Sequence, residues 1–224
     1  MKLDEMTCVV TGASGAAGSV IVDVLSKKCR AVVGVARGVE VNWHSLGGNR
    51  FEATADVLSQ TSVGFLVSEV LRHLDSFHVW INVVGGFSVG GSVEETESEE
   101  WPRMFDLNFI STLNCCKKTM PVFKTQQFGR IINFGSAAAL NGMALAAPYA
   151  VSKAAVVNLT KTIALEGKDS GITANVIVPT IIDKPENRKA MPEADFSKWT
   201  QPVAIADTIV EIVESGRSGR VIRV

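Results

Sequence analysis

The segment TCVVTGASGAAGSVIVDVLSKK, residues 7–28, predicts a strand, a glycine-rich turn and a helix in that order. Its first five residues form a short, mostly apolar run, which is typical of a strand buried on both faces of a parallel sheet. Apolar side chains recur at helical spacing from residue 16 onward. This order is typical of the first half of a βαβ unit.

The rest of the chain repeats the alternation of strand and helix. We expect further strands at 31–36, 51–56, 78–84, 130–136, 173–179 and 219–224. We expect helices at 61–74, 98–123, 203–215 and around YAVSK at 149–153. Such alternation predicts one α/β domain over 1–224 with a doubly wound, parallel, Rossmann-type sheet of about seven strands. The one long irregular stretch, 179–202, is interpreted as a lid-like substrate loop.

Composition and charge favour a globular protein with a small-molecule ligand. The chain has 224 residues and a formal net charge of −1. No long basic run predicts nucleic acid or membrane as a partner, and no apolar run approaches the ~20 residues that span a bilayer. The four cysteines lack metal-ligand spacing, so we expect no metal and reduced, packed thiols. A cytoplasmic protein is expected, because the N-terminus lacks a signal-peptide pattern.

The glycine-rich turn TGASGAAG, residues 11–18, is interpreted as a phosphate site. Glycines 12, 15 and 18 allow a tight turn and a close backbone approach. The helix that follows presents unpaired N–H groups and a partial positive charge. The spacing is GxxGxxG, so the general dinucleotide fingerprint GxGxxG is not matched letter for letter.

The next strand bears on which dinucleotide is bound. Dinucleotide folds place an acidic residue about 20 positions on, where it holds the ribose hydroxyls. Here Ala36 and Arg37 occupy that place, and the forked donors of Arg37 suit a 2′-phosphate. We therefore prefer NADP(H), with NAD(H) as the other possibility. Asp56 either contacts adenine or caps the following helix.

These features, taken with YAVSK, resemble the short-chain dehydrogenase/reductase family over essentially the whole chain. The resemblance is carried by the cofactor loop, by INVVGG at 81–86, by DLNF at 106–109, by NFGSAAA at 133–139 and by YAVSK. Within the family, the chain is similar to 3-oxoacyl-carrier-protein reductases. Two segments, 83–92 and 183–199, locally resemble dihydropteridine reductases.

The resemblance implies an NADP(H)-dependent oxidoreductase that acts on a small-molecule carbonyl or alcohol. The four catalytic residues it implies are Asn108, Ser136, Tyr149 and Lys153. Tyr149 exchanges the proton, Lys153 lowers the pKa of its phenol from one helix turn away and holds ribose hydroxyls, and Ser136 orients the substrate oxygen. Asn108 holds a water in a proton relay.

The expected cofactor contacts are Thr11, Gly12, Ser14, Gly15, Ala16, Ala17, Gly18, Arg37, Asp56, Asn82, Gly85, Tyr149, Lys153, Pro179 and Ile182. The sequence departs from the family pattern directly after the strand expected at 173–179. Thr180 replaces the glycine of a PG motif, and Lys184 replaces a threonine near the nicotinamide. The family pattern therefore does not fix the nicotinamide contacts of this chain, and the backbone of Ile182 is the contact expected for the carboxamide.

Two other functions are compatible with parts of the sequence. Reduction of a quinonoid pterin agrees with the local resemblance to dihydropteridine reductases, although those enzymes lack the serine and favour NADH. A non-catalytic NAD(P)-binding sensor agrees with the lost PG glycine, but it has no need of Ser136. The family resemblance also implies a homodimer or homotetramer that associates through the helix at 99–123 and the Tyr149 helix.

Overall fold

Eight strands form one sheet through the middle of the computed structural model, which describes all 224 residues. The strands are β1 (Thr7–Thr11), β2 (Ala31–Arg37), β3 (Trp43–Gly47), β4 (Arg50–Ala55), β5 (Val79–Asn82), β6 (Gly129–Phe134), β7 (Ile172–Val178) and β8 (Val221–Arg223). The helices are α1 (Ala16–Ser26), α2 (Gln60–Leu74), α3 (Glu100–Phe105), α4 (Ser111–Gln126), α5 (Ala138–Asn141), α6 (Ala147–Glu166), α7 (Pro185–Ala190) and α8 (Pro202–Ser215).

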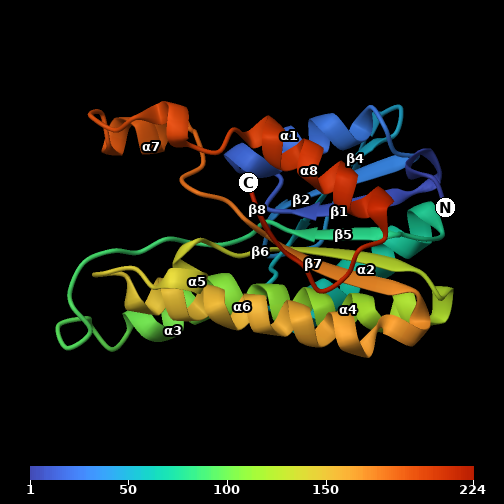
Figure 1. The fold of residues 1–224 in the computed structure, drawn as a ribbon. Coiled ribbons are helices and arrows are strands. Elements are labelled where there is room, and N and C mark those ends of the chain that lie inside the picture. Colours follow the sequence, from blue (N-terminus) through green and yellow to red (C-terminus); the bar gives the residue numbers. More distant parts are fainter.

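The sheet has the strand order β3-β4-β2-β1-β5-β6-β7-β8, and the helices lie on both of its faces (Figure 1). Helices α1 and α8 cover one face, whereas α2, α4 and α6 cover the other. Every strand pair except β3–β4 is parallel. The doubly wound α/β fold expected from the sequence is therefore confirmed.

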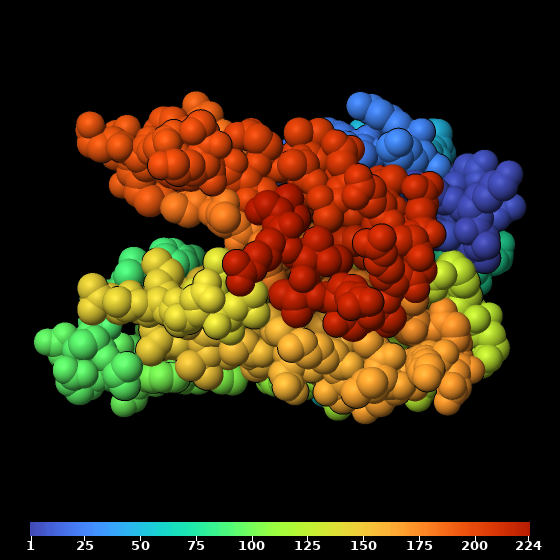
Figure 2. All heavy atoms as spheres, in the orientation of Figure 1, coloured from blue at the N-terminus to red at the C-terminus, as the bar shows by residue number.

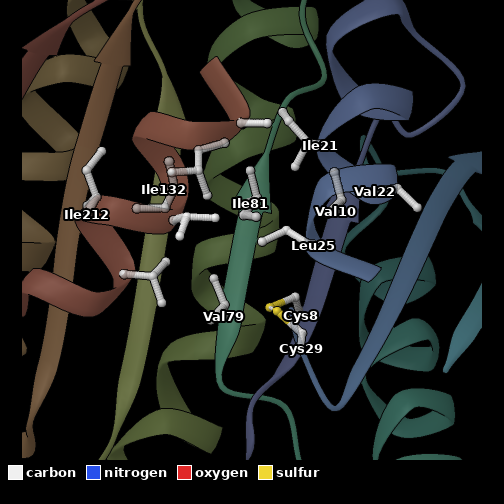
Figure 3. Close-up of a cluster of buried hydrophobic side chains, with 14 of the residues drawn as sticks. Cys8, Val10, Ile21, Val22, Leu25, Cys29, Val79, Ile81, Ile132 and Ile212 are labelled. Atoms are coloured by element: carbon white, nitrogen blue, oxygen red, sulfur yellow. Dashed lines mark hydrogen bonds between the residues drawn. The ribbon is translucent and has the colours of Figure 1, made fainter. Parts of the chain in front are cut away.

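Each face of the sheet has its own apolar core, because the central strands are buried on both sides. On the α1/α8 face, Ile21 and Leu25 pack with side chains from the neighbouring strands, among them Ile81 and Ile132 (Figure 3). On the other face Trp80 is fully buried beside residues of α2 and α4. The two cores hold the ends of the parallel strands in fixed register.

The cysteines pack as small core side chains. All four are buried and carry free thiols, as the sequence predicts. Cys8 on β1 and Cys29 before β2 lie together in the α1/α8 core, with their sulfur atoms 3.3 Å apart (Figure 3).

The structure differs from the sequence expectation at three elements. The eighth strand, β3, lies at the edge of the sheet and pairs antiparallel with β4, to which it is joined by a turn where Gly47 and Gly48 have positive φ. The helix expected at 98–123 is divided into α3, a π-helical turn (Asp106–Ile110) and α4. The stretch 179–202, here called the lid segment, is not irregular throughout, because it contains α7 and a 3₁₀ turn at Phe196–Lys198.

None of the helices combines the length and the apolar character that crossing a membrane requires.

Candidate active site

A cavity of about 1050 Å³ opens at the carboxyl ends of the parallel strands, which is where ligands bind in open α/β sheets. The glycine-rich turn and the ends of β2 and β4 line one end of it. The ends of β5 and β6, helix α6 and the lid segment line the other. A deep hollow is visible between the lid segment, coloured orange, and the yellow segment around α5 (Figure 2).

The glycine-rich turn lines the cavity with backbone. Gly12 has a φ of +71°, and the Gly15 N–H donates to its carbonyl oxygen at 3.0 Å. A β-carbon on Gly18 would lie 2.2 Å from the same oxygen, so only glycine allows helix α1 to begin this close to the turn. Ser14, Gly15, Ala16 and Ala17 also line the cavity, as the sequence predicts for a ligand-binding loop.

Two charged side chains line the end of the cavity beyond this turn. Arg37 lies exposed at the end of β2 and makes no hydrogen bond or ion pair within the protein. Asp56 follows β4, and its carboxylate accepts a hydrogen bond from the Leu58 N–H at 3.0 Å. The cap of helix α2 is instead Ser59, whose hydroxyl accepts from the Ser62 N–H. Capping of α2 by Asp56 is thereby excluded, which leaves its place in the cavity wall.

Tyr149 and Ser136 line the opposite end of the cavity together. Tyr149 lies in the first turn of α6, and Ser136 follows β6. Burial raises the pKa of Tyr149 above its ordinary value, and a hydrogen bond with Ser136 acts in the opposite direction. The ring of Phe87 packs edge-on against the phenol, with 4.9 Å between the ring centroids. The phenol is therefore fixed in place and protonated at neutral pH.

Lys153 lies one helix turn after Tyr149 and is buried, with 5% of its surface exposed. Its ammonium donates one hydrogen bond, to the Phe134 carbonyl oxygen at 2.9 Å. Burial lowers the pKa of Lys153 to about 8. The expected lowering of the pKa of Tyr149 by this ammonium is not found: burial raises the pKa, and the opposing effect comes from the hydrogen bond with Ser136. An ammonium has three donors, so two remain for a ligand in the cavity.

Asn108 lies beneath the cavity, in the π-helical turn between α3 and α4, and is fully buried. Its side-chain oxygen accepts from the Gly86 N–H at 2.9 Å, and its amide donates to the Ser152 hydroxyl at 3.0 Å. A β-carbon on Gly85 would lie 2.7 Å from that oxygen and 2.9 Å from the Lys153 ammonium nitrogen. The glycine thus lets the π-helical turn and Lys153 approach the same strand end. Single π turns of this kind are frequent at functional sites.

Two of the expected cofactor contacts do not line the cavity. Thr11 is 1% exposed and donates to the Ile81 carbonyl oxygen at 3.4 Å. Asn82 is 2% exposed, and its amide group accepts from the Trp80 indole at 2.9 Å and donates to the Asn133 oxygen at 2.8 Å. Both side chains therefore bind neighbouring strands beneath the site. The register of the sheet sets Thr11 beside β5 and Asn82 beside Asn133 of β6, so their hydrogen-bond partners come from these adjacent strands.

The lid segment contributes Pro179 and Ile182 to the cavity wall, as expected. Ile182 also forms a β-bridge with Thr200, which ties the two ends of the segment together. Trp199 is 7% exposed, packs on Phe196 and does not line the cavity. Trp199 therefore packs within the lid segment.

Sequence reasoning singled out none of the large apolar side chains of the cavity, although Met191 lies in the stretch interpreted as a substrate loop. Phe87, Met143 and Met191 all line the cavity, and they are 56%, 45% and 36% exposed respectively. They come from three loops that are distant in sequence, so no local spacing could identify them. Their position after strand ends was the available signal, since binding residues concentrate on loops at that edge.

Comparisons with known proteins identify the relatives of this chain. A family model described as short chain dehydrogenase matches residues 6–195. A 3β-hydroxysteroid dehydrogenase from Mediterraneibacter gnavus is 30% identical over 190 residues, which cover 82% of this chain and 68% of that protein. A 3-oxoacyl-[acyl-carrier-protein] reductase from Synechocystis is 29% identical over 219 residues, covering 92% and 88%. The aldohexose dehydrogenase structure from Thermoplasma acidophilum has the same fold, with a TM-score of 0.85 at 24% identity over 99% of this chain and 93% of that one.

Proposed function

The chain belongs to the short-chain dehydrogenase family, and we propose that it transfers hydride between NADP(H) and a carbonyl or alcohol carbon. Membership makes it an oxidoreductase of C=O and CH–OH groups that uses a nicotinamide cofactor. The observation that carries the finer proposal is that Ser136, Tyr149 and Lys153 line the same cavity as the glycine-rich turn. A dinucleotide bound along that turn would bring its reactive ring towards the phenol.

The residues of the cavity suit a dinucleotide. The contact between Gly18 and Gly12 leaves a backbone surface that a phosphate can approach, and the N-terminus of α1 lies directly behind it. The two free donors of the Lys153 ammonium suit ribose hydroxyls, and Pro179 and Ile182 suit the face of a nicotinamide. When bound, the nicotinamide supplies or accepts the hydride.

The proton is the part of the reaction that this chain supplies. In the direction of reduction, Tyr149 donates its phenolic proton to the substrate oxygen as charge builds on it. Its raised pKa keeps that proton in place at neutral pH. The Ser136 hydroxyl donates a second hydrogen bond to the same oxygen. Asn108 holds the Gly86 backbone and α6 in position for this transfer.

Arg37 supports NADP(H) over NAD(H). It is the only charged residue of β2, it borders the cavity, and no carboxylate of the protein pairs with it. A 2′-phosphate would supply the missing partner, whereas the plain ribose of NAD(H) would leave the guanidinium unpaired. Asp56 is the one acidic residue on the cavity wall, and it does not pair with Arg37. It follows β4, which lies one strand further from β1 than the β2 strand that carries Arg37.

The cofactor proposal is tested by fluorescence titration of the purified protein with NADPH and NADH, repeated on Arg37→Ala. We expect NADPH to bind more tightly, and the variant to lose at least about tenfold in NADPH affinity while NADH binding stays unchanged. Lys2→Ala, at the exposed N-terminus, is the matched control for loss of one positive charge. Equal binding of the two dinucleotides by the unaltered protein would contradict the preference.

The catalytic proposal is tested by turnover with a panel of ketones, quinones and 3-oxo esters. The names of the relatives favour 3-oxoacyl thioesters and 3-ketosteroids as the first compounds to try. Tyr149→Phe removes only the phenolic oxygen, so we expect a loss of about 100-fold or more in kcat with unchanged NADPH affinity. A quinonoid pterin belongs in the panel, and full activity of Ser136→Ala on it alone would contradict a carbonyl mechanism.

For the assembly, we propose a homodimer or homotetramer formed through α4 and α6. Both helices lie on the outer surface of one sheet face (Figure 1), and α6 exposes Val151 at 46% and Leu165 at 78%. Side chains this apolar favour burial against a second copy of the chain. Analytical ultracentrifugation checks the proposal, and Leu165→Glu is expected to yield monomers.

A further inference from the structure

The cavity has four charged side chains on its wall, and three of them already have a proposed role. Arg37 and Asp56 lie at the end beyond the glycine-rich turn, and Lys153 lies beside Tyr149. The fourth is Lys184, where the sequence departs from the family pattern. Three cations and one anion thus face a ligand that enters this space.

Lys184 is the cation that the lid segment contributes to the cavity. It directly precedes α7, is half-buried, and makes no side-chain hydrogen bond or ion pair within the protein. Two ion pairs form within the lid segment, Arg188 with Asp183 and Lys198 with Asp195, and neither includes Lys184. A half-buried ammonium that is left unpaired on a cavity wall favours an anionic ligand.

The glycine-rich turn supplies no cation of its own. Its residues that line the cavity are Gly12, Ser14, Gly15, Ala16, Ala17 and Gly18, which offer N–H groups and one hydroxyl. A dinucleotide places two negative charges at such a turn, and partial helix charge balances only part of them. A cation from another part of the cavity wall would complete the balance.

We propose that Lys184 binds an anionic oxygen of the ligand, and that this oxygen belongs to the diphosphate of the dinucleotide. The inference rests on the proposed function. Lys184 would hold the diphosphate from the lid side while the glycine-rich turn holds it from the sheet side. The lid segment would then close over the cofactor through a charge contact, independently of the contacts of Arg37.

The test is titration of the full chain with NADPH and with NADH, for the unaltered protein and for Lys184→Gln. We expect both dinucleotides to bind about tenfold more weakly to the variant, since both carry the diphosphate. Arg37→Ala, by contrast, should affect NADPH alone. Lys184→Arg should restore most of the affinity. Lys189→Gln is the matched control, because Lys189 is an exposed lysine of α7 that does not line the cavity.

A different source of the anion would give a different result. If Lys184→Gln binds both dinucleotides normally but its KM rises for a 3-oxo acid and not for the matching ester, the anion is a substrate carboxylate and the diphosphate assignment is overturned. Unchanged affinity together with unchanged KM overturns the inference and leaves the proposed function intact. An unaltered protein that binds neither dinucleotide overturns both.

Discussion

The glycine-rich turn and the lid segment border the same cavity, but side chains contribute more of the contacts in the lid segment than in the turn. In the turn the contacts are made by backbone: Gly15 donates to Gly12 at 3.0 Å, and Ala13 donates to Val35 of β2 at 3.1 Å. In the lid segment backbone bonds tie the two ends together, with Asp183 donating to the Thr200 carbonyl oxygen at 2.9 Å, and side chains add further contacts. Arg188 donates to Asp183 at 2.6 Å, and Asn187 donates to the Ile182 carbonyl oxygen at 2.8 Å.

This difference predicts how each region responds to substitution. A backbone contact of the kind seen between Gly12 and Gly18 has no room for a single added carbon. A side-chain contact at the surface can be lost while the backbone beneath it stays in place, because exposed ion pairs contribute little. We therefore expect large effects from small changes in the turn and small effects from larger changes in the lid segment.

The largest effect is expected for Gly18→Ala. The new β-carbon would lie 2.2 Å from the Gly12 carbonyl oxygen, so α1 and the turn must move apart. We expect a loss of about 1–3 kcal/mol in the free energy of unfolding. Turnover should fall by roughly 100-fold, the order that a 1 Å misplacement costs in reaction rate. Chemical denaturation and steady-state kinetics measure the two quantities.

Gly64→Ala is the matched control for this substitution. Gly64 lies within α2, and a β-carbon there meets only the flexible end of Lys118 at 3.6 Å. Alanine is favoured over glycine inside a helix by about 0.5–1 kcal/mol, so the control should be as stable as the unaltered chain or more so. If Gly18→Ala behaved like this control, the turn would not be held by its backbone contact.

The next largest effect concerns Lys153, which borders the space between the turn and the lid segment. Its pKa of about 8 means that the ammonium is present below that pH and is lost above it. Dinucleotide affinity should therefore fall as pH rises past about 8, by up to about tenfold per pH unit. Lys153→Met should bind weakly and lack this pH dependence. Affinity that stays constant between pH 7 and 9.5 in the unaltered protein would contradict a role for the ammonium.

The same contrast explains which features the sequence predicted. The positions of Gly12, Gly18 and the Tyr149–Lys153 pair depend on local geometry, namely a turn that needs glycine and a spacing of one helix turn. Both kinds of feature can be recognised in a short quoted stretch. The prediction of the doubly wound sheet succeeded for a related reason, since strands buried on both faces are continuous apolar runs.

Features that depend on distant partners were not predictable. Asn82 was expected to contact the cofactor, but its side chain is hydrogen-bonded to Trp80 and Asn133. Asn133 comes from the adjacent strand β6. Strand β3 has no apolar run of its own and exists through its pairing with β4. The direction of the pKa shift of Tyr149 depends on how deeply the fold buries the phenol, which spacing alone does not reveal.

A smaller effect is expected in the lid segment for Asp183→Asn. Arg188 and Gln201 both donate to this carboxylate, and together they lower its pKa to about 2. The variant should raise the KM for the dinucleotide by at most about fivefold, with the melting temperature nearly unchanged. Steady-state kinetics and a thermal melt measure these effects.

The charge state of Asp183 gives this prediction a second test. Its folded pKa lies below the ordinary carboxyl value, so the ion pair with Arg188 persists down to acidic pH and is lost only as pH falls through about 2. The difference in KM between the variant and the unaltered chain should therefore stay constant from pH 5 to 8. Lys198→Gln, which breaks the exposed pair with Asp195, is the control and should have no effect on KM.

The smallest effect is expected where Thr180 replaces the family glycine. Its hydroxyl and that of Thr200 lie 2.7 Å apart, and Thr200 also accepts from the Thr180 N–H at 3.1 Å and donates to the Val224 carbonyl oxygen at 2.8 Å. Thr180→Val should cost about 1 kcal/mol, the net value of one hydrogen bond. Thr200→Val should cost more, because it leaves two backbone groups without their partner.

A double-mutant cycle with these two valine variants isolates the contact between the hydroxyl groups. If side chains hold the lid segment closed, the double variant should be less destabilised than the sum of the two, with a coupling free energy of about 0.5–1 kcal/mol. Strict additivity would mean that the two hydroxyls do not interact in solution. The lid segment would then be held, like the glycine-rich turn, by its backbone bridge between Ile182 and Thr200, and the contrast between the two regions would disappear.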